Sequence, residues 1–326
     1  MHIEAFSEAK NPAAPGANED ALLILPGRAY AAIDGVSDRT GVRYDGMLAG
    51  QYASTLVRRR LEEILGGAQA CPPRAIVDDL TAAIDAAYGR FGIREQVRTD
   101  WGGKIASTLA LAYHQGDTTH ILLVGDSGVR LNGTTLIREE KDLDRITSLL
   151  RREAWRLLKA RTPDPLLLEK LSRQLSFHGT AQPPAPHLDA ETLSAIATAA
   201  QSACTADLPH IPPSIIADLI AGGIVGAQGG HQNNLASPLG YSCLDGTEIP
   251  DRFIRTLSFP RSEITTIELF TDGYFRPGDH FGVAAWEAAF QAAEAEDPAK
   301  IEIHLSPKGS GGGLWADDRS YLGVRL

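Results

Sequence analysis

Cysteine is scarce in this 326-residue sequence, which has three cysteines at wide spacings and no CxxC pair. Such an odd and sparse set is neither a disulfide framework nor a tetrahedral zinc site. Long apolar runs are missing as well. No segment approaches the roughly 20 apolar residues that span a bilayer, and the N-terminus has no apolar core of signal-peptide length. We therefore expect a cytoplasmic protein in a reducing compartment, with no membrane partner.

Positive charge is also in short supply, with 31 Lys and Arg against 41 Asp and Glu and a formal net charge of −10. Nucleic-acid backbones are bound by clusters of Lys and Arg, so this balance argues against a nucleic-acid partner. An excess of carboxylate is suited to binding cations instead. The chain is long enough to bury a hydrophobic core without disulfides or structural metals.

Short apolar segments bounded by turn residues alternate with stretches of helical periodicity, which predicts both strands and helices. We expect a strand, turn and strand over 21–34, an antiparallel meander over 105–137, and strands over 252–259, 264–270 and 321–326. Helices are expected over 44–65, 72–91 and 282–295, with a helical stretch at about 141–221 that the Pro-rich segment 181–187 interrupts. The pattern favours an α+β fold with antiparallel sheets and outer helices, formed by one domain over 1–326 with a helical insertion at about 141–221.

Acidic residues stand repeatedly where an apolar run begins or stops. Carboxylates that converge at strand ends repel one another unless a cation neutralises them. All of the candidate ligands are oxygens, which favours Mg²⁺ or Mn²⁺ over zinc or copper. The residues are Glu19 and Asp20 before ALLIL, Asp34 and Gly35 after AYAAI, Asp126 after ILLVG, Asp272 after IELFT, and Asp317 before YLGVRL.

An Asp-Gly pair is a common turn sequence, so any one of these positions taken alone is more simply a turn. Their joint order resembles that of the metal-dependent Ser/Thr protein phosphatases, the PPM or type 2C family. The resemblance covers the whole chain except the helical insertion. The matching pieces are NED (18–20), AIDGVSD (32–38), ASTLALAY (106–113), VGDSGVRL (124–131), LFTDGYF (269–275) and ADDRS (316–320).

The resemblance implies a four-layer α/β/β/α sandwich of two antiparallel sheets flanked by helices, with a two-metal centre in a cleft at one end of the sheets. Carried over residue by residue, Asp34 would bridge both metals and the Gly35 carbonyl would bind one of them. Asp272 and Asp317 would complete the shell of the first metal, and Glu19 would act through water.

Two further residues have places in the same pattern. Asp20 matches the second acidic position of the NED piece, and Asp126 matches a ligand of a weaker third metal. The implied activity is hydrolysis of phosphoserine and phosphothreonine by metal-activated water, without a covalent phospho-enzyme. The implied partners are a phosphorylated protein substrate and a cognate kinase.

The chain departs from the family on the substrate side. The family commonly has an Arg four residues before the NED glutamate, where this chain has Pro15, and many members have a His directly after Asp-Gly, where it has Val36. Lys10, Arg39 and Arg43 are the candidate replacements for the phosphate-binding Arg. Two alternatives therefore stay open: a pseudophosphatase that serves as a binding or regulatory module, and a small-molecule phosphomonoesterase.

Overall fold

The computed structural model describes residues 1–38, 40–67, 71–100, 102–181 and 188–326. Arg39 and residues 182–187 of the expected helix break lie outside the described residues. The described chain divides into two compact units. The sandwich unit contains Met1–Glu139, Tyr241–Phe290 and Asp317–Leu326, and the helical unit contains Glu140–Gly240 and Gln291–Ala316. The prediction of one domain with an insertion stays a prediction.

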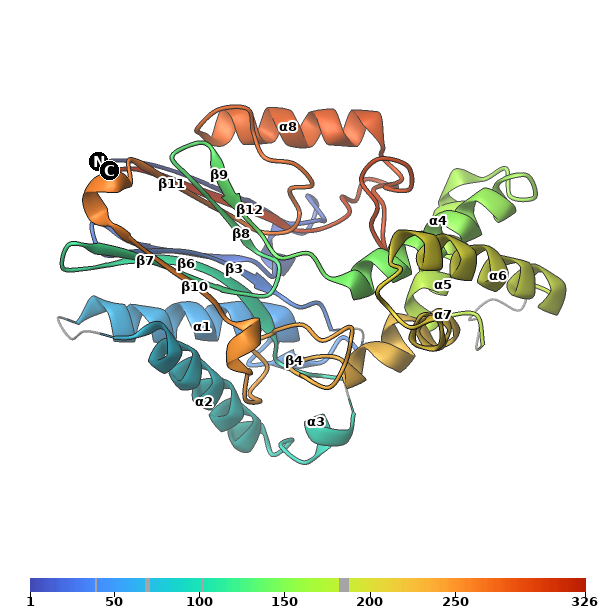
Figure 1. The fold of residues 1–326 in the computed structure, drawn as a ribbon, viewed down its shortest axis with the longest axis horizontal. Coiled ribbons are helices and arrows are strands. Elements are labelled where there is room, and N and C mark those ends of the chain that lie inside the picture. The colour runs from blue at the N-terminus through green and yellow to red at the C-terminus, as the bar shows by residue number, and fades with distance from the viewer. Residues whose placement is uncertain (39, 68–70, 101, 182–187) are drawn as a thin grey trace. The chain divides into compact units, whose positions relative to one another are not determined.

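The sandwich unit is built on two five-stranded antiparallel sheets. Helix α8 (Val283–Glu296) starts over sheet A, and helices α1 (Ala49–Gly66) and α2 (Pro73–Phe91) cover sheet B (Figure 1). This arrangement confirms the predicted α+β four-layer sandwich. Sheet A has the order β1 (His2–Glu8), β12 (Arg319–Arg325), β11 (Thr266–Phe270), β8 (Gly128–Leu131), β9 (Thr135–Ile137). Sheet B has the order β10 (Arg255–Pro260), β7 (Thr118–Val124), β6 (Ser107–Gln115), β3 (Ala29–Gly35), β2 (Ala21–Leu25).

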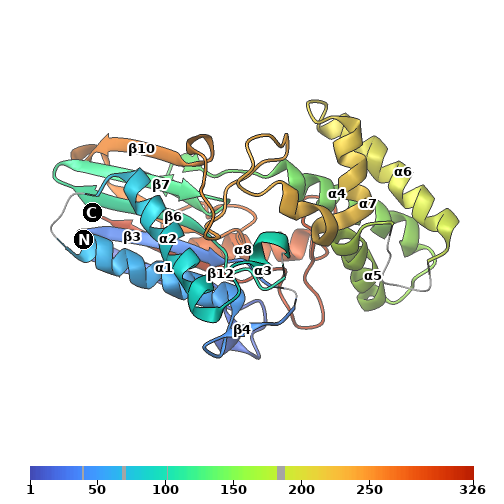
Figure 2. The same ribbon diagram turned by 90° about the horizontal axis from the view of Figure 1, so that it is seen from below.

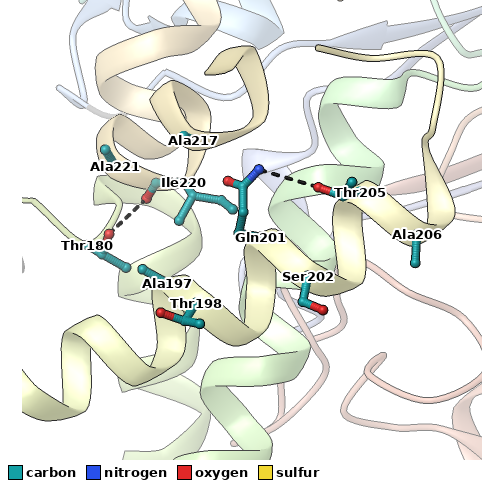
Figure 3. Close-up of a pocket in the computed structure, with 10 residues that line it drawn as sticks. All are labelled: Thr180, Ala197, Thr198, Gln201, Ser202, Thr205, Ala206, Ala217, Ile220 and Ala221. Carbon is teal, nitrogen blue, oxygen red and sulfur yellow. Dashed lines mark hydrogen bonds between the residues drawn. The ribbon is translucent and has the colours of Figure 1, made fainter. Parts of the chain in front are cut away.

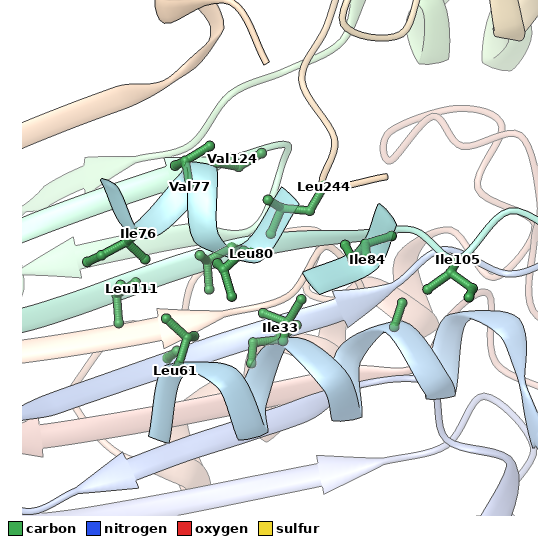
Figure 4. Packing of buried hydrophobic residues seen from close by; sticks show 14 of the residues in the cluster. Ile33, Leu61, Ile76, Val77, Leu80, Ile84, Ile105, Leu111, Val124 and Leu244 are labelled. Atoms are coloured by element: carbon green, nitrogen blue, oxygen red, sulfur yellow. The ribbon is translucent and has the colours of Figure 1, made fainter. Parts of the chain in front are cut away.

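Strand β3 is buried on both faces, because it lies between the two hydrophobic layers of the unit. Tyr30 and Ala32 point into the layer between the sheets, while Ala31 and Ile33 point toward α1 and α2. All four are 0% exposed. Figure 4 shows Ile33 facing the apolar side chains of α1 and α2, among them Leu61. The packing therefore fixes the backbone that carries Asp34.

The prediction that residues 105–137 form one antiparallel meander is wrong, because their strands belong to two sheets. Strands β6 and β7 pair in sheet B, whereas β8 and β9 pair in sheet A. The chain crosses from one sheet to the other between Val124 and Gly128. Gly125 makes this possible with a φ of +83°, and a Cβ there would lie 2.6 Å from Cγ2 of Thr108. The crossing places Asp126 between a strand of sheet B and a strand of sheet A.

Two features near the N-terminus differ from the sequence-based expectation. The helix predicted from residue 44 begins at Ala49, because Arg43–Tyr44 (β4) and Met47–Leu48 (β5) form a hairpin. Asp45 and Gly46 at its turn both have positive φ, which is the geometry of the tightest hairpin turn. Strand β1 was not predicted, although it pairs along its whole length with β12.

The described part of the helical unit contains four long helices, which pack against one another (Figure 2). Its interior includes an ion pair: the guanidinium of Arg151, which is 0% exposed, contacts Glu169 and donates to the carbonyls of Lys300 (3.2 Å) and Ser306 (3.0 Å). None of the described helices combines the length and low polarity needed to cross a bilayer. The helices are α4 (Asp142–Lys159), α5 (Pro165–His178), α6 (Ala190–Asp207) and α7 (Pro213–Ala227).

A hollow of about 740 Å³ lies within the helical unit and is lined mainly by α6 and α7 (Figure 3). Its polar lining consists of hydroxyl groups and the amide of Gln201. None of the residues that line it is ionisable. The hollow therefore has no group for acid–base chemistry or metal binding, and the candidate chemistry belongs to the sandwich unit.

The buried carboxylate of Glu268 on β11 provides a test of this packing. It is 0% exposed and accepts hydrogen bonds from Arg130 (2.6 and 2.7 Å), Trp286 (2.9 Å) and Tyr321 (2.9 Å). Replacing Glu268 with Ala leaves the Arg130 guanidinium buried with backbone carbonyls but without its carboxylate counter-charge, so we expect a loss of about 3–5 kcal/mol in the free energy of unfolding. Urea unfolding measures this loss. Glu263→Ala, at an exposed position, is the control and should change stability by less than about 0.5 kcal/mol.

Candidate metal centre

Three aspartates from separate segments meet in the sandwich unit. Asp34 lies at the end of β3, Asp126 in the crossing between β7 and β8, and Asp272 directly after β11. Each offers a carboxylate oxygen, and these oxygens all lie within 4.8 Å of one another. Both sheets contribute, since β3 belongs to sheet B and β11 to sheet A. We call Asp34, Asp126 and Asp272 the aspartate triad; its geometry suits a hard cation.

The electrostatics of the triad favour a bound positive charge. Burial raises the pKa of Asp34 well above its usual range, and the carboxylates of Asp272, Asp20 and two further aspartates raise it more. Burial and the neighbouring Asp318 likewise raise the pKa of Asp20 to about 8. Carboxylates with raised pKa values retain their protons unless a bound cation replaces those protons.

Asp20 is held in place by a threonine that adjoins the triad. Thr271 donates its hydroxyl to Oδ2 of Asp20 (2.8 Å), while its own oxygen accepts the backbone N–H of Ser320 (2.8 Å). Oδ1 of Asp20 is buried without a hydrogen-bond partner. A buried carboxylate oxygen in that state fits a cation or a bound water at this place.

Two glycines allow the first turn of α1 to approach the end of β3. A Cβ on Gly50 would lie 2.6 Å from Oε1 of Glu19 and 2.7 Å from the carbonyl oxygen of Gly35. A Cβ on Gly35 would overlap the backbone of Gly50. Two predicted metal ligands, Glu19 and the Gly35 carbonyl, thus border a space that any side chain at position 50 would fill.

Lys10 lies among the remaining carboxylates. Its ammonium nitrogen contacts Oε2 of Glu19 (2.9 Å) and Oδ2 of Asp318 (3.0 Å), and lies 3.9 Å from Oδ1 of Asp317. Burial works against its charge, but Asp317, Glu19 and Asp318 together raise the pKa of Lys10 above its ordinary value. Lys10 is therefore a permanent cation in this part of the site.

The resemblance placed Asp34, Asp272 and Asp317 around the first metal, whereas the structure groups Asp126 with Asp34 and Asp272. Asp34 and Asp272 are close as expected, but Asp126 completes the group within 4.8 Å. Asp317 lies on the side of Lys10 and acts on Asp34 as a neighbouring charge. The resemblance had reserved Asp126 for a weaker third metal.

The candidate phosphate-binding residues have different surroundings. Arg43 donates to the carbonyl of Gly46 (2.8 Å) within its own hairpin, and Arg39 lies outside the described residues. Sequence reasoning missed the contributions of Gly50, Thr271 and Asp318. The signals were present but ambiguous, because a glycine at a helix start or the second aspartate of a pair has many ordinary explanations.

No protein-family model matches the chain, and no curated protein matches it. Among solved structures it is similar to PppA, a key regulatory component of the T6SS in Pseudomonas aeruginosa, with 15% identity, a TM-score of 0.45 and coverage of 99% of this chain and 96% of that one. It is similar to the Mycobacterium tuberculosis serine/threonine phosphatase PstP/Ppp with 17% identity, a TM-score of 0.41 and coverage of 100% and 98%.

A further similar structure is the serine/threonine phosphatase Stp1 from Staphylococcus aureus, with 11% identity, a TM-score of 0.44 and coverage of 100% and 95%. One structure of the catalytic domain of PstP is in complex with 2 manganese ions. It is 16% identical to this chain, with a TM-score of 0.44 and coverage of 99% of this chain and 97% of that one. At such identities the activity of the present chain has to be argued from its own residues.

The space beside Gly50 gives a prediction for metal binding. Gly50→Ala inserts a methyl group against Glu19 and Gly35, so we expect weaker Mn²⁺ binding and a loss of about 1–3 kcal/mol in the free energy of unfolding. Calorimetric Mn²⁺ titration and urea unfolding measure the two effects. Gly66→Ala, in the same helix with no heavy atom within 4 Å of the added Cβ, is the matched control and should leave Mn²⁺ affinity unchanged. Equal Mn²⁺ affinities for both variants would contradict this account of the space.

The raised pKa of Asp20 predicts how stability depends on pH when metal is removed with EDTA. Its pKa of about 8 in the folded protein lies above the ordinary value of 3.8, so the folded state keeps a proton that the unfolded state releases. This contribution to the free energy of unfolding is present below about pH 4 and is lost as pH rises to about 8. Asp20→Asn should therefore lose less stability than wild type between about pH 6 and about pH 8 in urea unfolding. Parallel curves for the two proteins would exclude this titration.

Proposed function

We propose that the chain is a metal-dependent phosphatase that hydrolyses phosphate monoesters of serine and threonine with water. The observation that carries the proposal is the aspartate triad, which gathers three carboxylates from both sheets within 4.8 Å. Packed strands precede Asp34 and Asp272, so these carboxylates are held close together by the fold despite their repulsion. Sites of this kind are stable when a cation offsets the charge.

The donor set supports Mn²⁺ or Mg²⁺ as the cofactor. Asp34, Asp126 and Asp272 would hold the ion, and each offers a carboxylate oxygen, the ligand that these hard cations prefer. The buried Oδ1 of Asp20 supports the same choice. A divalent ion bound there would supply a water of lowered pKa and would offset charge on the phosphoryl oxygens.

The chain's own residues would orient the groups around that ion. Thr271 fixes Asp20 by hydrogen bonding, and the β3 backbone fixes Asp34. Val36, which stands where many family members have a His, is 39% exposed and offers no proton. We infer that affinity for phosphate depends on the cation more than on a dedicated cationic side chain.

The resemblance of the motifs to the PPM family supports a phosphoprotein substrate, and with it a kinase that forms this substrate. The same resemblance supports two ions, with Glu19, Gly35 and Asp317 as further ligands. A regulatory role without turnover and a small-molecule substrate are the alternatives that the activity test separates.

The decisive assay is hydrolysis of p-nitrophenyl phosphate and of a phosphothreonine peptide with Mn²⁺. We expect turnover of both, its abolition by EDTA, and a fall of about a hundredfold or more in Asp272→Asn, because a ligand of the ion is lost. Asp218→Asn, at an exposed position on α7, is the matched control and should retain full activity.

Each other outcome has a distinct meaning. The absence of metal-dependent turnover, with Mn²⁺ still bound, would contradict the enzyme and favour a binding module. Turnover of the aryl phosphate but of no phosphopeptide would contradict the protein substrate and favour a small metabolite. Full activity in Asp272→Asn would exclude the aspartate triad as the metal site.

A further inference from the structure

The ammonium group of Lys10 uses all of its hydrogen-bonding capacity inside the protein. It donates to Oε2 of Glu19 (2.9 Å), to Oγ of Ser37 (2.7 Å) and to Oδ2 of Asp318 (3.0 Å). An ammonium has three N–H donors and no more. In this arrangement Lys10 has no donor left for a substrate phosphate, although the sequence made it a candidate for that role.

The acceptors of this ammonium are themselves built into the fold. Glu19 is 2% exposed and Asp318 is 3% exposed. Asp318 also accepts the backbone N–H of Lys10 through its other oxygen (2.7 Å), and Ser37 donates its hydroxyl to Glu19. One lysine thus connects the segment after β1, the segment before β2 and the segment before β12. Without it, Glu19 and Asp318 would be buried without the ammonium that neutralises them.

We propose that Lys10 is a built-in cation of this site, whose ammonium occupies the position between Glu19 and Asp318 that a divalent ion would otherwise take. The inference rests on the proposed metal centre. It assigns the ammonium to Oε2 of Glu19, and it leaves the aspartate triad and the side of Glu19 that faces the Gly35 carbonyl, where Oε1 lies, to divalent ions. The position has oxygens from Glu19, Ser37 and Asp318, with Asp317 at 3.9 Å, which is a donor set that Mn²⁺ also accepts.

The consequence is a change in metal stoichiometry that a single substitution can reveal. Lys10→Met removes the ammonium and leaves the oxygens, so this variant should bind one more Mn²⁺ per chain than wild type. Lys10→Arg keeps a cation and should keep the wild-type number. Lys159→Met, at an exposed position near the end of α4, is the control and should also keep it. Equilibrium dialysis with metal analysis measures the number of ions.

Inhibition by inorganic phosphate separates this role from phosphate binding. If the ammonium is fully engaged, the inhibition constant of phosphate at saturating Mn²⁺ should rise by less than about threefold in Lys10→Met, whereas the loss of a charge-assisted hydrogen bond to phosphate would raise it about tenfold or more. A rise of that size with an unchanged number of ions in Lys10→Met would overturn the proposal in favour of a phosphate-binding lysine.

A measurement on the wild-type protein covers the case in which Lys10→Met does not fold. The Nζ resonance of Lys10, assigned by comparison with Lys10→Arg, should remain protected from solvent exchange when Mg²⁺ saturates the protein. Loss of that protection on adding Mg²⁺ would mean that the metal displaces the ammonium, and would overturn the proposal. Failure of wild type to bind any Mn²⁺ would instead contradict the metal centre itself.

Discussion

Repulsion between carboxylates at the end of the sandwich is the constraint around which the site is arranged. Burial and the surrounding carboxylates raise the pKa of Asp34 well above its ordinary value, and Asp20 is affected in the same way. Such groups stay together only because the strands that carry them are fixed by packing. The fold supplies that packing through β3, whose side chains are buried on both faces.

The buried carboxylates at this site need positive charge to neutralise them, and a lysine of the chain supplies part of it. Lys10 neutralises Glu19 and Asp318 directly, while the aspartate triad gathers three carboxylates within 4.8 Å of one another. This division of the site gives the two sides different chemistry. We propose that the side chain of Lys10 completes one side and that an ion from solution completes the other.

Much of this arrangement follows from the sequence because it depends on local pattern. Alternating apolar segments predicted β2, β3 and the C-terminal strands, and the position of Asp34 and Asp272 at strand ends followed from the same reading. The crossing at Gly125 was not predicted, because strand periodicity does not say which sheet a strand joins. The sequence nevertheless predicted Asp126 as a ligand at this site, but assigned it to a weaker third metal rather than to a group with Asp34 and Asp272.

Contacts between segments far apart in sequence were out of reach for a similar reason. The contact between Lys10 and Asp318 joins residues near the two ends of the chain. It depends on the pairing of β1 with β12, and the alternating pattern of β1 had not been recognised as a strand. The close approach of Gly50 to Gly35 depends on where α1 starts, which the Asp45-Gly46 hairpin shifts to Ala49. Local sequence pattern predicted the candidate ligands, whereas the contacts that surround them depend on tertiary packing.

Anomalous diffraction from a crystal soaked in Mn²⁺ tests the central claim most directly. The account predicts a manganese peak within coordination distance of Asp34, Asp126 and Asp272, with the ammonium of Lys10 still on Glu19 and Asp318. No peak at the aspartate triad in crystals that show manganese elsewhere would contradict the metal centre, and with it the proposed chemistry.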